Sequence, residues 1–211
     1  KELYEATVQE IKFRNYKCET MNVVKASSKS NPAIRKTANS KLPICPSTGR
    51  KHNCFGTVIS SKRKYIGEFK NDKFNGYGKY YHLANDKYKG YFYEGEWLNN
   101  KRHGVGTVIW PDGNKYVGEQ KNGQLHGFGT YFSLAENKFK GDKYTGEYQN
   151  GKRHGKGTYS HANGNKYVGE YRNGKPNGLG TYYYLANDKF RGFVHSCLLY
   201  TSDAADESDR V

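Results

Sequence analysis

Leu, Ile, Val and Phe are scarce in this chain: with 10, 6, 10 and 10 copies they make up 36 of its 211 residues. No run of apolar residues approaches the ~20 that a helix needs to cross a bilayer. So few apolar residues, together with a formal net charge of +15, are typical of disordered chains. The composition excludes the thick aliphatic core of an ordinary enzyme domain, but not a thin structure built on aromatic rings.

Sequence motifs of catalysis are also lacking. The chain has no GxxxxGK[ST] phosphate loop and no Gly-x-Ser-x-Gly nucleophile elbow. Its four Cys, at positions 18, 45, 54 and 197, lack the paired CxxC spacing that closes a zinc site. Cys45 and Cys54 are near enough along the chain to form a disulfide in an oxidising compartment, or to stay two free thiols. The sequence therefore predicts no catalytic, cofactor-binding or metal-binding residues.

Tyr and Gly, by contrast, are abundant, with 20 and 25 copies that recur at a fixed spacing. Five segments share the pattern Tyr-x-Gly-Glu-x, and each is followed by a polar, Asn-rich turn and a Gly-x-Gly motif. The segments begin at positions 65, 93, 116, 144 and 167, so their spacing alternates between 28 and 23 residues. Two nested registers of this kind indicate a repeat protein.

Each unit is predicted to be a β-hairpin. Side chains alternate along a strand, so the leading Tyr and the aromatic residue four positions later share one face and the Glu lies on the other. The Asn-rich turn supplies the positive φ angles of a tight hairpin. A glycine repeated inside a strand indicates that a large ring from the neighbouring hairpin covers it. The predicted structural positions are Tyr65, Gly67, Tyr93, Gly95, Tyr116, Gly118, Tyr144, Gly146, Tyr167 and Gly169.

A lone hairpin is marginal in water, so the units must stack. We expect an all-β fold, an elongated single antiparallel sheet of tandem hairpins over residues 43–193, with units starting near 65, 93, 116, 144 and 167. Residues 1–42 lack the repeat and are predicted to be a poorly structured N-terminal segment, a fragment plus linker. Residues 194–211 also lack it. They resemble translated adapter read-through and are interpreted as a foreign tail, with a genuine acidic tail as the alternative.

The tandem pattern resembles the MORN (membrane occupation and recognition nexus) repeat family over about residues 52–193. The resemblance implies a non-catalytic scaffold that binds a protein partner or a membrane. Residues 45–57 resemble a half-unit that opens bacterial MORN arrays, where it commonly follows a signal peptide. This second resemblance favours export, for example to the periplasm, over a cytoplasmic location, and it favours a bridge between Cys45 and Cys54.

The longer units carry five extra residues in a segment that itself recurs, and these segments predict a row of contact points. Each places an aromatic residue between two basic ones. Projecting from every second unit, roughly 19 Å apart, they would form partner-binding loops. The alternative is that they only lengthen the sheet at one edge. The residues concerned are Lys87, Tyr88 and Lys89, then Lys138, Phe139 and Lys140, then Lys189, Phe190 and Arg191.

The excess of Lys and Arg suits an anionic partner, yet the basic residues are spread out. Lipid binding favours clusters of four to eight, whereas Lys on turns and edges also keeps a thin sheet soluble. The tyrosines fall where packing needs them, which argues against nucleic acid. We predict an unidentified protein partner that binds a concave aromatic groove or the protruding loops, with peripheral binding to anionic phospholipid membranes as the alternative. The exposed terminal strand is expected to allow pairing with a second copy in a homodimer.

Two polar ladders recur with the repeat and are interpreted as structural. His103, His126 and His154 would lie about 10 Å apart, too far to share one metal ion. The carboxylates form a uniform ladder without a pair in differing environments, as a glycosidase would need, and are interpreted as partners of Lys, Thr or backbone amides. They are Glu68, Glu96, Glu119, Glu147 and Glu170.

Overall fold

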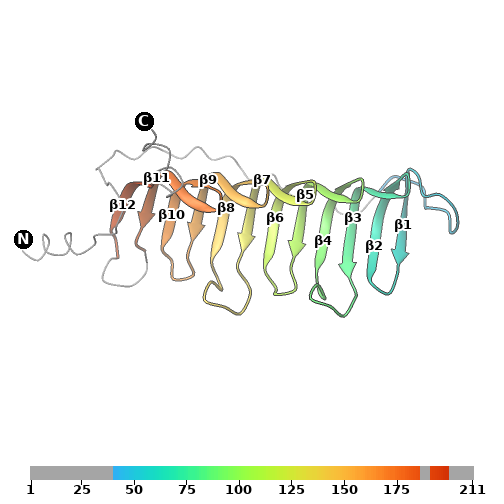
Figure 1. Ribbon diagram of the computed structural model, residues 1–211, viewed down its shortest axis with the longest axis horizontal. Helices are drawn as coiled ribbons and strands as arrows, with labels where there is room; N and C mark the ends of the chain where they lie inside the picture. Colours follow the sequence, from blue (N-terminus) through green and yellow to red (C-terminus); the bar gives the residue numbers. More distant parts are fainter. Residues whose placement is uncertain (1–39, 186–190, 200–211) are drawn as a thin grey trace, which may run out of the picture.

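The computed structural model describes residues 40–185 and 191–199, which form one elongated sheet (Figure 1). Its 12 strands lie side by side in chain order, and every neighbouring pair is antiparallel. The predicted all-β fold with a single antiparallel sheet is confirmed. The strands are β1 Cys54–Ile59, β2 Arg63–Lys70, β3 Lys73–His82, β4 Phe92–Leu98, β5 Lys101–Ile109, β6 Lys115–Lys121, β7 Gln124–Phe132, β8 Lys143–Gln149, β9 Lys152–Ser160, β10 Lys166–Arg172, β11 Lys175–Tyr183 and β12 Val194–Leu199.

The two long edges of the ribbon differ. Tight turns inside the hairpins follow one edge, and the longer connections between hairpins follow the other, at the bottom of Figure 1. The sheet continues through β12, beyond the predicted boundary at 193, because β11 offers a free row of backbone groups and Thr181 pairs with Ser196. The predictions for residues 1–39, 186–190 and 200–211 lie outside the described residues.

The tight turns have the backbone that the sequence predicts. Asn122 and Gly123 have φ angles of 53° and 86°, and two later turns repeat this Asn-Gly pair. Positive φ at both central residues defines the type I′ turn, whose twist matches that of the flanking strands. The first two hairpins reach the same geometry with Asn71–Asp72 and Asn99–Asn100, residue types that tolerate the left-handed region.

Each leading tyrosine lies across two glycines of its own hairpin. A Cβ placed on Gly67 would come within 2.5 Å of the Tyr65 hydroxyl, and one on Gly78 would overlap the same ring. The expectation of a ring from the neighbouring hairpin is therefore wrong. Gly67 and Gly78 face each other directly across β2 and β3, so the Tyr two residues earlier already reaches both. The hydroxyl donates to the backbone carbonyl of Glu68 at 3.0 Å, which satisfies its polar end.

The other four units repeat this arrangement. The hydroxyl groups of Tyr93, Tyr116, Tyr144 and Tyr167 each donate to the carbonyl three residues later, and each ring covers its own glycine pair. The rings of Tyr65, Tyr93, Tyr116 and Tyr144 are almost completely buried. A side chain larger than hydrogen at the paired glycines would displace them.

Edge-on rings connect one unit to the next. Trp97 lies between Tyr65 and Tyr93, with centroid distances of 5.6 and 5.0 Å and nearly perpendicular planes. Such edge-to-face pairs contribute about 0.5–1.5 kcal/mol each beyond the burial of their area. Tyr148 joins Tyr116 to Tyr144 in the same way, and Tyr171 joins Tyr144 to Tyr167. The corresponding residue of the third unit is Gln120, so the chain of rings is interrupted once.

The first glycine of each Gly-x-Gly motif has a separate role. Gly76 has a φ of 81°, at a point where the register between β2 and β3 shifts. The carboxylate of Glu68 lies where a Cβ of Gly76 would be and accepts a hydrogen bond from the Tyr77 amide at 3.3 Å. Glu119 and Glu147 accept equivalent bonds from Phe128 and Lys156. The structural interpretation of these three carboxylates, as partners of backbone amides, is confirmed.

A disulfide closes the β1 end of the described array. Cys45 and Cys54 are joined, and residues 43–45 pair with β1 through the backbone of Phe55. The Cys45 side chain lies over Gly56, at 3.0 Å from a Cβ placed there. Gly56 faces Gly67 across the strands. The disulfide thus covers a glycine that has no tyrosine of its own half-unit to cover it.

Substituting the second glycine of a motif tests the packing of the tyrosines. Gly129→Ala is expected to cost about 3 kcal/mol in the free energy of unfolding, because its Cβ would overlap the buried Tyr116 ring. Gly49→Ala is the control: its φ is 84° but nothing lies within 4 Å, so only a backbone cost of about 1 kcal/mol is expected. Urea denaturation measures both, and equal costs would contradict the arrangement.

Restoring the interrupted chain of rings should stabilise the protein. Gln120 is only 3% exposed, and its amide nitrogen and oxygen have no hydrogen-bond partner among the described residues. Gln120→Tyr removes this buried polar group and supplies the missing ring, so we expect a gain of about 1–2 kcal/mol. The melting temperature should rise by about 2–4 °C per kcal/mol. Gln149→Tyr, at an exposed position at the end of β8, should leave it unchanged.

Candidate functional site

The first long connection, residues 83–91, holds one aromatic side chain outward. Tyr88 is 51% exposed. Its amide donates to the Asp86 carboxylate at 2.8 Å, and two backbone bonds, from Lys89 to Asp86 and from Tyr91 to Tyr88, close the loop. The pKa of Asp86 lies below its usual value, chiefly because the Tyr88 amide donates to the carboxylate. The loop is therefore ordered by its own hydrogen bonds.

The second long connection, residues 133–142, reproduces this geometry 51 residues later. The Phe139 amide donates to the side chain of Asn137 at 2.9 Å, and the backbone bonds from Lys140 and Asp142 match those of the first loop. Phe139 is 49% exposed, almost as much as Tyr88. Two loops of different sequence thus present an aromatic ring from the same position on the same backbone.

The predicted basic residues of these loops are held close to the rings. Lys87 Nζ lies 5.0 Å from the centroid of Tyr88, and Lys138 Nζ lies at the same distance from that of Phe139. At this distance a cation is attracted by the face of a ring. The second Lys of each loop has a local polar partner instead. Lys89 donates to Asn85, and Lys140 pairs with Glu136.

The third predicted loop is described only in part. Lys189 and Phe190 lie outside the described residues, whereas Arg191 is exposed. The sequence analysis did not single out the Leu that begins each long loop, although its recurrence every 51 residues is visible. Leu83, Leu134 and Leu185 are each about half exposed. We define the loop row as these five exposed apolar side chains of the described loops: Leu83, Tyr88, Leu134, Phe139 and Leu185.

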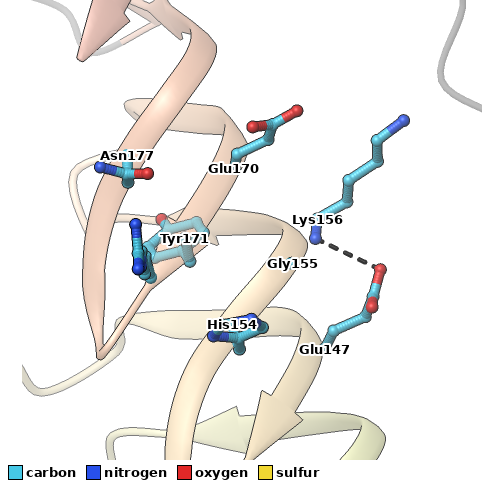
Figure 2. A pocket seen from close by; sticks show the side chains of 8 residues that line it. Glu147, His154, Gly155, Lys156, Glu170, Tyr171 and Asn177 are labelled. Carbon is cyan, nitrogen blue, oxygen red and sulfur yellow. Dashed lines mark hydrogen bonds between the residues drawn. The ribbon is translucent and has the colours of Figure 1, made fainter. Parts of the chain in front are cut away.

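Apart from the loops, the surface has a shallow depression over β8–β11 (Figure 2). It contains Glu147, His154, Lys156 and Glu170. Figure 2 shows the carboxylate of Glu147 turned toward the Lys156 amide, which donates to it at 3.2 Å. Glu68 and Glu119 make the same bond in their own units. The carboxylate–amide bond in the depression is therefore a feature of the repeat.

The described residues were also compared with the requirements of a metal site and of a membrane-spanning helix. Among residues 40–185 and 191–199, no group of three or more His, Cys, Asp or Glu side chains could hold a metal ion. His103 Nδ1 is buried without a hydrogen-bond partner there. The same part of the chain contains no helix long and apolar enough to cross a membrane.

Burial shifts the ionisation of the leading tyrosines. Removal from water disfavours the phenolate and raises the pKa of Tyr167 to about 12, with the nearby Glu170 carboxylate acting in the same direction. The same causes raise the pKa of Tyr65 and Tyr116 still further. These hydroxyl groups therefore stay protonated donors throughout the physiological pH range.

Comparison with protein families matches the MORN repeat at residues 65–82, 93–115, 116–133, 144–166 and 167–185. The chain belongs to the MORN repeat family. Each match begins at a leading tyrosine, so the family pattern coincides with the ring and glycine-pair unit seen in the structure. A comparison with the curated proteins finds no match. MORN arrays are repeat scaffolds, commonly for protein or membrane interaction, and the family is generally non-catalytic.

The raised tyrosine pKa values predict loss of stability at alkaline pH. A pKa higher in the folded than in the unfolded chain stabilises fully below the unfolded value of about 10, and this contribution is lost as pH rises through about 12. Absorbance at 295 nm should show the buried tyrosines ionising only as circular dichroism reports unfolding. In 8 M urea all 20 should titrate together. Complete ionisation near pH 10 with an intact sheet would contradict this expectation.

Proposed function

We propose that this MORN array is a non-catalytic scaffold that binds a protein partner through the loop row. The observation that carries the proposal is that Tyr88 and Phe139 are both about half exposed, at the same position of two loops with matching hydrogen bonds. Large aromatic side chains supply much of the energy at protein interfaces. Loops that are already ordered lose little conformational entropy on binding.

The spacing of the loops favours an extended contact. Tyr88 and Phe139 lie four strands apart, which corresponds to roughly 19 Å along the ribbon. A partner would meet similar apolar points in succession, each flanked by a Lys. The family's generally non-catalytic character supports the absence of chemistry in this role.

Peripheral attachment to an anionic membrane is a second candidate, and a specific observation favours it. The same loops combine exposed Leu and aromatic side chains with Lys. This combination suits the boundary between lipid headgroups and acyl chains. Each Lys near an anionic surface contributes about 1 kcal/mol.

Removing the two exposed rings tests the protein-binding function. The double variant Tyr88→Ser/Phe139→Ser should capture at least tenfold less of any protein that the purified, unmodified array binds. Cross-linking followed by quantitative mass spectrometry measures the amount captured. The matched control, Leu98→Ser/Leu179→Ser, removes two comparably exposed apolar side chains elsewhere and should keep the capture. Equal capture by all three proteins would contradict the loop row as the contact.

Co-sedimentation with phosphatidylserine vesicles tests membrane attachment separately from protein binding. Replacing Lys87, Lys89, Lys138 and Lys140 by Gln should abolish pelleting if the loops bind lipid, and added salt should do the same. The matched control replaces four Lys of the opposite edge, Lys73, Lys101, Lys121 and Lys152. No pelleting of the unmodified chain at low salt would eliminate this candidate.

A further inference from the structure

An aromatic strip runs along the sheet face that holds the buried tyrosines, beside the long connections. We define it as the partly buried rings that pack against the buried core and supply at least one ring in each of the five units. The members are Tyr80, Tyr91, Trp110, Tyr131, Tyr159 and Tyr182. Trp110 contacts Tyr131 at 5.5 Å between centroids, and Tyr80 contacts Tyr91 at 6.2 Å.

Closure of the core does not require rings at these positions. Val108 faces Tyr93 as Tyr131 faces Tyr116, so it takes the register position of Tyr131 in the second unit, where it is fully buried. At this position an aliphatic side chain satisfies the packing, and Trp110, two residues later, supplies the ring of that unit. The larger rings are partly buried and leave part of their aromatic surface exposed at the rim of the core.

We propose that the aromatic strip binds a proline-rich segment of a partner in the polyproline II conformation. That helix has three residues per turn and rises 3.1 Å per residue, about 9.3 Å per turn. Two strands of the sheet advance about 9.6 Å. Every third residue of such a segment therefore meets a ring of the next unit, and aromatic-lined grooves are the general means of recognising this conformation.

The charges beside the strip favour an acidic version of this ligand. The Arg102 guanidinium lies 5.7 Å from the centroid of Tyr91, and that of Arg153 lies 5.2 Å from the centroid of Tyr159. They follow the strip two units apart, in a chain whose formal net charge is +15. Arg102 uses two of its five N–H donors for the Tyr91 hydroxyl and the Gly123 carbonyl, and the Tyr159 hydroxyl donates to the buried carboxylate of Asp142. Carboxylates between the prolines would meet the remaining donors of the guanidinium groups. This inference rests on the proposed scaffold function but uses a surface separate from the loop row.

A single-tryptophan protein tests the proposal. The chain has 2 Trp, so Trp97→Phe leaves Trp110, within the strip, as the only one. The first unit already has Phe69 at the position of Trp97, which makes the change a mild one. Titration with the peptide (Pro-Pro-Glu)6 should change the Trp110 fluorescence saturably, with Kd below about 1 mM. The flexible peptide (Gly-Ser-Glu)6, of equal length and charge, should bind at least tenfold more weakly. Equal binding of the two peptides would overturn the proposal.

Strand alternation supplies a matched pair of variants. Tyr131→Val removes one ring of the strip and mimics Val108, and we expect about fivefold weaker peptide binding. Phe132→Val alters the adjacent residue, which points to the opposite face, and should leave the affinity unchanged. Melting temperatures confirm that both variants are folded. Equal effects of the two substitutions would overturn the assignment to the strip.

Two further binding measurements identify which ligand the aromatic strip takes. Oligo(dT) that binds more tightly than (Pro-Pro-Glu)6 would replace the proposal by a nucleic-acid ligand. The variant Tyr88→Ser/Phe139→Ser should keep peptide binding, whereas loss there would assign the peptide to the loop row and overturn the inference. If the peptide fails to bind while that variant loses its protein partner, the inference fails and the proposed scaffold function stands.

Discussion

The rest of the structure depends on a tyrosine ring lying across a pair of glycines that face each other in one hairpin. The contact is possible only without Cβ atoms, and the ring hydroxyl then reaches a backbone carbonyl of its own strand. A chain so poor in aliphatic residues can in this way bury large apolar surfaces within a single sheet. Because each unit is closed by its own tyrosine, units can be added in tandem, and edge-on rings such as Trp97 join them.

This construction separates stability from binding. The tyrosine, the glycine pair and the carboxylate over the positive-φ glycine are local to each unit, while the long connections lie outside that packing. Tyr88 and Phe139 can therefore project without cost to the core. The long connections recur only in every second unit. A binding surface built on them is periodic over twice the structural period.

Much of this architecture follows from the sequence, because the hairpin signals are local. Asn122–Gly123 and the Tyr-x-Gly-Glu pattern predict the turn, the strands and the faces of their side chains. The origin of the covering ring was predicted wrongly, since alternation assigns a face but not which hairpin supplies the ring. The positive φ of Gly76 and the contact of Cys45 with Gly56 depend on register and on the path of the chain before β1, which spacing alone does not specify. The sequence did not predict Leu83 and Leu134 as exposed binding residues, because apolar residues are ordinarily assigned to a core.

The most direct test of the central contact is the chemical shift of the glycine α-protons in solution. A tyrosine ring lying across a glycine shifts those protons far upfield by its ring current. We expect this shift at the second glycine of all five motifs, Gly78, Gly106, Gly129, Gly157 and Gly180, and not at the open Gly49 and Gly113. Resonances of the five at ordinary strand values, in a folded protein, would contradict the account.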